Sequence, residues 1–175
     1  MATALLIVLF IIIALLVFTS FKPSTFRVER LVNIQASPEK IFPVINDLHQ
    51  HLNWSAWEKI DPNMRRIFSG PPSGVGAIYE WNGNRQIGQG RIEILESIPS
   101  SRIIMKIDFI QPFKATNTLE YTLKAQSNST TVTHAMFGDS PYIANLMCLF
   151  FDREKMVGGK FEESLNALKV ICESK

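Results

Sequence analysis

The amino-terminal segment most constrains how this chain can fold. Residues 1–21 contain no charged side chain, and residues 4–18 are an unbroken apolar run of Leu, Ile, Val, Phe and Ala. A helix of that length, rising about 1.5 Å per residue, is roughly 31 Å long, close to the about 30 Å of a bilayer's hydrocarbon core. Because the run is apolar on every side, it lacks the polar stripe of a helix that packs on a globular core. The segment therefore predicts an uncleaved transmembrane anchor.

Two other interpretations of residues 1–21 stay open. A cleaved signal peptide carries basic residues before its apolar run and small residues at its cleavage site, and this segment has neither feature. A buried core helix is the second alternative. The anchor prediction places in lipid the side chains of Leu5, Leu6, Ile7, Val8, Leu9, Phe10, Ile11, Ile12, Ile13, Leu15, Leu16, Val17 and Phe18.

Basic residues follow the apolar run but do not precede it. The first are Lys22, Arg27 and Arg30, and such residues accumulate on the cytoplasmic side of membrane proteins. We therefore expect a single-pass membrane protein with its folded part on the cytoplasmic side. Residues 22–25 are too short a juncture to hold that part far from the bilayer, so membrane lipid is an expected partner of the helix.

Residues 26–175 have the composition of one globular domain. All 18 basic and 16 acidic side chains of the chain lie from Lys22 onward, and the net charge is +2. No basic cluster with interleaved aromatic side chains is present, which argues against nucleic-acid binding. Cys148 and Cys172 are the only cysteines, too few for a disulfide framework. An apolar core must therefore stabilise the domain.

Turn-forming clusters of Gly, Pro, Asn and Ser divide the middle of the chain into segments of strand length. Apolar and polar residues alternate clearly in 102–110, where Ile103 and Met105 share the apolar face. Gly88 and Gly90 predict a bulge or a sharp bend. The pattern predicts seven strands, mostly antiparallel, over residues 26–35, 64–69, 77–81, 85–98, 102–110, 114–125 and 130–137.

Helical patterns flank these strands. Residues 37–39 combine an N-cap serine, a proline and an acidic residue, which is typical of a helix start, and 49–57 predict a second short helix or turn. From Ile143 onward, apolar residues recur mostly three or four positions apart, which predicts one long helix covering the apolar face of the sheet. Gly158 and Gly159 lie in its middle, where we expect a kink or a break.

Six short motifs occur in a recognisable order. They are ASPEKIF at 36–42, NDL at 46–48, WSAW at 54–57, GVGA at 74–77, GQGRI at 88–92 and FEESLNAL at 161–168. With the order of the predicted elements, they resemble the START-like (SRPBCC) superfamily, in the branch named for polyketide cyclases, dehydratases and lipid transport. The resemblance implies an α+β helix-grip fold, a curved seven-stranded antiparallel sheet around the C-terminal helix. It also implies a cavity between them for a lipid, isoprenoid, polyketide or other hydrophobic molecule.

Large aromatic side chains are the candidate walls of that cavity. Ligand pockets are lined mainly by aromatic and aliphatic groups. Ordinary core packing is the alternative for each candidate. The candidates are Trp54, Trp57, Tyr79, Trp81, Phe109, Phe113, Phe137, Tyr142, Phe150 and Phe161.

The sequence predicts no catalytic set, no metal site and no cofactor. The three histidines lack ligand spacing with cysteines or carboxylates, and neither cysteine has a neighbouring histidine to activate it. A buried acid or histidine facing the cavity would still permit proton transfer. The candidates on predicted strands are Glu80, Glu93, Asp108, Glu120 and His134. Alternation places most of these five on the outer, solvated face instead.

Three functions remain open. The leading hypothesis is a membrane-anchored binding or carrier domain for a hydrophobic small molecule. The alternative is a cyclase or dehydratase, which requires a buried acid or histidine facing the cavity. A non-enzymatic protein-interaction module is the third, and it predicts a filled cavity together with a large exposed apolar patch.

Overall fold

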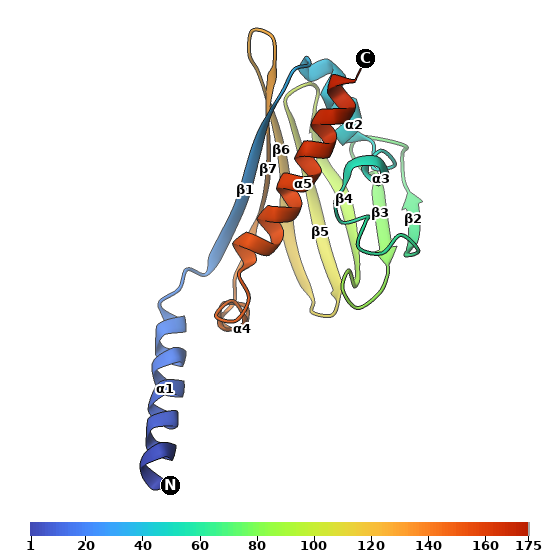
Figure 1. The fold of residues 1–175 in the computed structure, drawn as a ribbon. Coiled ribbons are helices and arrows are strands. Elements are labelled where there is room, and N and C mark those ends of the chain that lie inside the picture. The colour runs from blue at the N-terminus through green and yellow to red at the C-terminus, as the bar shows by residue number, and fades with distance from the viewer. Residues whose placement is uncertain (175) are drawn as a thin grey trace.

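The computed structural model describes residues 1–174. Two layers, a seven-stranded sheet and the helix α5, make up its main body (Figure 1). The elements in chain order are α1 (Ala2–Ser20), β1 (Thr25–Ile34), α2 (Pro38–Asn46), α3 (His51–Trp54), β2 (Arg65–Ser69), β3 (Ile78–Asn82), β4 (Gln89–Ile98), β5 (Arg102–Gln111), β6 (Ala115–Ala125), β7 (Thr130–Asp139), α4 (Tyr142–Met147) and α5 (Arg153–Glu173).

The sheet has the strand order β1-β7-β6-β5-β4-β3-β2, and every neighbouring pair is antiparallel. Ile103 and Met105 are fully buried on the face toward α5, where they meet Leu165 and Leu168 in the main apolar core. The predicted sheet, its antiparallel pairing and the C-terminal helix that covers it are confirmed.

The pairing of β4 with β5 is irregular beside Gly90, where the glycine pattern predicted a bulge or a bend. The pairing of β4 with β5 shifts register between Gln89 and Gly90, and again between Ile94 and Glu96. A Cβ atom at Gly90 would clash with the Trp81 ring, so only glycine lets this ring lie flat over the strand.

The break in the C-terminal helix lies earlier than predicted. Instead of one helix kinked at Gly158 and Gly159, the chain forms α4, a short turn and then α5, which is continuous across both glycines. Asp152 caps α5, because its carboxylate accepts a hydrogen bond from the backbone N–H of Lys155 at 3.0 Å. Gly158 serves packing, since a Cβ atom there would clash with the guanidinium of Arg30.

The helix α1 projects from the domain, and its last turns contact the α4 region (Figure 1). The hydroxyl of Tyr142 donates to the carbonyl of Leu16 at 2.9 Å, and Thr19 is only 1% exposed. The part of α1 before Leu16 is about 21 Å long at 1.5 Å per residue, shorter than the hydrocarbon core of about 30 Å.

Among the residues that the structure describes, no helix is long and apolar enough to cross a membrane. The prediction of a single-pass membrane protein with its folded part on the cytoplasmic side is therefore wrong. The described residues give no support to membrane lipid as a partner. Of the side chains assigned to lipid, those of Val8 and Ile12 lie outside the described part. All of the others are exposed.

Candidate functional site

A cavity of about 330 Å³ lies between the concave face of the sheet, α3 and α5. Its walls are mainly apolar, and the β3–β4 and β5–β6 loops contribute Ile87 and Phe113. The volume is at the lower end of the range for small-molecule pockets, about 300 to 1,000 Å³. The site is thus a pocket of ligand size within the core of the domain.

Seven of the ten aromatic candidates line this cavity. Alternation along β3 brings Tyr79 and Trp81 to the same face, and α5 contributes Phe161 from the opposite side. The seven are Trp54, Trp57, Tyr79, Trp81, Phe109, Phe113 and Phe161. Their binding to a ligand remains a prediction, but their shared location fits it.

The other three candidates do not line the cavity. Phe137 lies on the outer face of β7, where its ring centroid is 5.0 Å from the Arg27 guanidinium. Tyr142 contacts α1, and Phe150 is 76% exposed in the turn between α4 and α5. Phe137 shares the outer face with Ala135, two positions before it, whereas His134 and Met136 on the same strand line the cavity.

One polar group in the cavity wall is fully paired. The Glu58 carboxylate accepts a hydrogen bond from the Tyr79 hydroxyl at 2.5 Å and another from Arg66 Nε at 2.7 Å. Burial, together with the hydrogen bond to Glu58, raises the pKa of the Tyr79 phenol well above its usual value. The polar side chains at this end of the cavity therefore form hydrogen bonds with one another.

A second polar cluster in the cavity wall consists of His51 and Trp54 on α3 and His134 on β7. Most of its nitrogen atoms that are named below lack a hydrogen-bond partner in the described part of the chain. The His134 ring stacks between Tyr121 and Phe161, with centroid distances of 4.0 and 3.6 Å. Neither His134 ring nitrogen, nor the indole nitrogen of Trp54, has a hydrogen-bond partner among the described residues. His51 lies beside Trp54, and its Nε2 is 3.1 Å from the Ile45 carbonyl oxygen.

Both cavity histidines are neutral at physiological pH. Burial lowers the pKa of His51 to about 4, despite its contact with the Ile45 carbonyl. Burial, and to a lesser extent the nearby His51, lowers the pKa of His134 well below its usual value. A neutral imidazole carries one donor and one acceptor, so the two rings are suited to hydrogen bonding with an uncharged group.

Sequence reasoning missed Glu58 and gave His51 no role in the cavity. Glu58 lies in the turn after α3, where alternation along a strand gives no information, although its spacing of four residues from Trp54 is a weak helical signal. Of the strand candidates, His134 faces inward, while Glu120 and Asp108 form ion pairs on the outer face. Among the described residues, no cluster of His, Cys, Asp and Glu could hold a metal ion.

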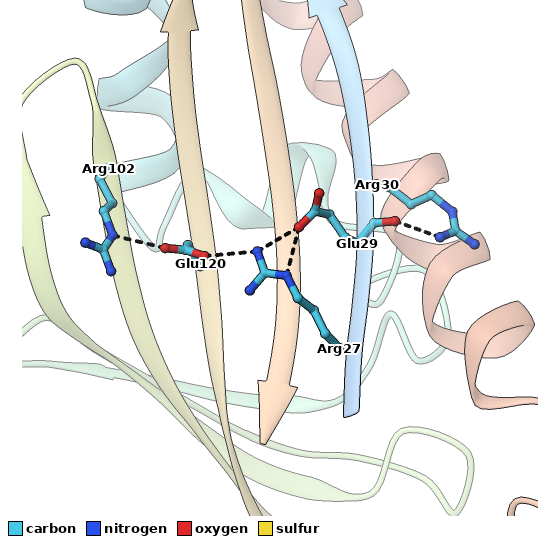
Figure 2. Close-up of polar contacts among 5 residues, drawn as sticks. All are labelled: Arg27, Glu29, Arg30, Arg102 and Glu120. Atoms are coloured by element: carbon cyan, nitrogen blue, oxygen red, sulfur yellow. Dashed lines mark hydrogen bonds and ion pairs between the residues drawn. The ribbon is translucent and has the colours of Figure 1, made fainter. Parts of the chain in front are cut away.

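The outer face of the sheet carries a continuous chain of ion pairs (Figure 2). Arg102 Nε lies 3.0 Å from one oxygen of Glu120, whose other oxygen lies 3.2 Å from Arg27. Arg27 in turn pairs with Glu29 at 2.7 Å. The chain crosses from β5 to β1 over Ala135, whose small side chain leaves room for it. This face is polar and internally paired.

No protein-family model matches the sequence, and no curated protein matches it. Solved structures share the fold. Protein CV1439 from Chromobacterium violaceum is 18% identical, with a TM-score of 0.58 over 88% of this chain and 100% of its own. The corresponding values for Ara h 8.0201 are 13% and 0.59, over 86% and 99%.

BexL, a di-domain ARO/CYC from the BE-7585A biosynthetic pathway, is 13% identical, with a TM-score of 0.64. The match covers 90% of this chain and 53% of BexL. At such identities the likeness shows the fold alone. It confirms the helix-grip fold that the motifs implied.

Proposed function

We propose that this domain binds a hydrophobic small molecule in the cavity between the sheet and α5, and acts as a binding or carrier domain. The observation that carries the proposal is the cavity itself, about 330 Å³ with mainly aromatic and aliphatic walls. Protein interiors are normally packed without voids much larger than a water molecule. A core that contains this open space is therefore suited to binding a small-molecule ligand.

The shared fold supports the proposal. Solved structures of the same fold include a di-domain ARO/CYC from a biosynthetic pathway. In this chain the aromatic side chains of WSAW and of β3 meet α5 around the cavity, which is the arrangement expected from the START-like motifs.

A cyclase or dehydratase is the second candidate. It is favoured by the position of Glu58, His51 and His134 in the cavity wall. A general base works best when its pKa is near the working pH, whereas the pKa of His51 is about 4. Glu58 already accepts two hydrogen bonds, from Tyr79 and Arg66. These groups are better placed to bind than to transfer protons.

The third hypothesis, an interaction module, required a filled cavity. The open volume counts against it. Exposed apolar side chains do occur around the junction of α4 and α5, including Ile143, Phe150 and Met156. Nothing in their arrangement specifies a partner.

The proposal is tested with the full chain and the neutral fluorescent probe N-phenyl-1-naphthylamine. Ile107→Trp places a large side chain in the cavity, and Ile104→Trp is its matched control on the opposite face of β5. We expect Ile107→Trp to reduce probe affinity by about tenfold or more, while Ile104→Trp binds like the unmodified chain.

Thermal unfolding of both variants checks that they are folded. Mass spectrometry of an organic extract of the purified chain then identifies any copurified ligand. Absence of probe binding by the unmodified chain, or equal binding by both variants, would contradict the proposal.

A further inference from the structure

We propose that the ligand carries one uncharged hydrogen-bonding group, a hydroxyl or a ketone carbonyl, which binds at His134 and Trp54, and that the site rejects carboxylates. This inference rests on the proposed function and specifies the class of ligand. The observation behind it is a set of polar atoms that the protein buries in the cavity wall and leaves unpaired.

The unpaired atoms are the two ring nitrogens of His134 and the indole nitrogen of Trp54. His134 is 4% exposed and Trp54 is 2% exposed, and both side chains line the cavity. Buried polar atoms in folded proteins almost always have a partner. Since the described residues offer none to these atoms, a group on the ligand is the natural partner.

The surrounding rings hold these atoms in place. His134 is clamped between Tyr121 and Phe161, so its ring cannot turn toward the backbone without losing both stacking contacts. Trp54 is itself packed edge-on against Tyr121, with centroids 6.1 Å apart. Such preorganised donors and acceptors bind a ligand group without first having to be ordered.

The chemistry of these atoms favours a neutral group. The Trp54 indole is a donor only, and a neutral imidazole supplies one donor and one acceptor. A hydroxyl pairs with both kinds of atom, and a ketone oxygen accepts from the donors. Burial keeps His134 uncharged, since its pKa lies well below the usual value. The site therefore offers no full positive charge to an anion.

The charges near the cavity work against a carboxylate. Among the described residues that line the cavity, Glu58 is the only charged side chain, and it is an acid. Arg66 forms a hydrogen-bonded ion pair with Glu58. Arg30 lies opposite His134 in the sheet, but its guanidinium bonds to Glu154 on α5. A buried carboxylate without a cationic partner is strongly unfavourable.

The test compares three probes that share a twelve-carbon chain: dodecan-1-ol, dodecan-2-one and dodecanoate. Each is titrated as a competitor against N-phenyl-1-naphthylamine bound to the full chain at pH 7.5, and the loss of probe fluorescence gives its affinity. We expect the alcohol and the ketone to bind at least about tenfold more tightly than dodecanoate. Equal or tighter binding of dodecanoate would overturn the inference while leaving the proposed function intact. Absence of binding by every probe, N-phenyl-1-naphthylamine included, would overturn both.

A pair of variants locates the polar contact. His134→Phe keeps an aromatic ring between Tyr121 and Phe161 but removes both nitrogens, and His49→Phe is the control at an exposed histidine outside the cavity. We expect His134→Phe to weaken dodecan-1-ol binding by about tenfold, while His49→Phe binds dodecan-1-ol like the unmodified chain. Unchanged dodecan-1-ol affinity in a folded His134→Phe variant would overturn the assignment to His134.

Discussion

The two faces of the sheet treat polar groups in opposite ways, and neighbouring residues of β6 and β7 show the contrast. Glu120 points outward and joins Arg102 to Arg27 (Figure 2), whereas the next residue, Tyr121, points inward and stacks on His134. Charges on the outer face are paired where water would also solvate them. The His134 nitrogens on the inner face are buried and have no partner among the described residues.

This contrast separates stability from function. Ion pairs at an exposed surface contribute little, about 0–1 kcal/mol each, while a buried unpaired polar group destabilises a fold by about 1–3 kcal/mol. Stability alone would therefore favour an apolar side chain at position 134. Keeping a histidine there is readily explained by a ligand that completes its hydrogen bonds.

The largest difference between the faces should appear in the apolar packing of β5. Ile103 is fully buried against the core, and its neighbour Ile104 is half-buried on the outer face. We expect Ile103→Ala to lower the free energy of unfolding by about 2–5 kcal/mol and Ile104→Ala to lower it by about 1 kcal/mol or less. Urea denaturation measures both, and equal losses would contradict the assignment of the two faces.

An effect of intermediate size on the free energy of unfolding is expected from the protonation of His134 at low pH. In the folded chain its pKa is far below the usual value, whereas in the unfolded chain it is about 6.5. Below pH 6.5 the unfolded state therefore binds a proton that the folded state does not, and stability falls as the pH falls. The loss from this group grows as the pH falls below 6.5, and at pH 5 it is at most about 2 kcal/mol.

His134→Phe removes this pH-dependent loss. We expect the variant to be at least as stable as the unmodified chain at pH 8, and to gain a further advantage of at most about 2 kcal/mol at pH 5. Urea denaturation of both proteins at the two pH values gives the difference. A stability difference that does not change with pH would show that His134 is not held neutral by burial.

The smallest effect is expected on the outer face. Glu120→Gln removes the carboxylate that Arg27 and Arg102 share, and both arginine side chains are close to half exposed. We expect a loss of about 1 kcal/mol or less, which shrinks further as salt screens the charges. A loss above about 2 kcal/mol that persists in 1 M salt would show that the outer face is not the weaker one.

The sheet was predictable because its strands obey a simple rule. Alternation in 102–110 and turn clusters between the strands are local features, and they predicted the seven antiparallel strands and the side of the sheet that faces α5. Gly158 and Gly159 predicted a break in the middle of the helix, but α5 begins at Arg153 after its N-cap Asp152 and continues past both glycines. Here the glycine that matters, Gly158, accommodates Arg30 rather than a kink.

The candidate site was predictable only in part. Tyr79, Trp81 and Phe109 line the cavity. They could be predicted because each is a bulky aromatic residue at an inward position of a strand. Glu58 lies in an irregular turn, so no periodicity indicated its direction. The unpaired state of His134 depends on what surrounds it in three dimensions, and no local pattern encodes that.

The most direct test of the central claim is the ¹⁵N NMR spectrum of the histidine rings. The chain has only three histidines, which makes assignment by substitution straightforward. When dodecan-1-ol binds, we predict that the ring nitrogens of neutral His134 change chemical shift as they gain hydrogen bonds, while those of His49, exposed and paired with Asp47, do not. Binding of dodecan-1-ol with no change at His134 would contradict the account.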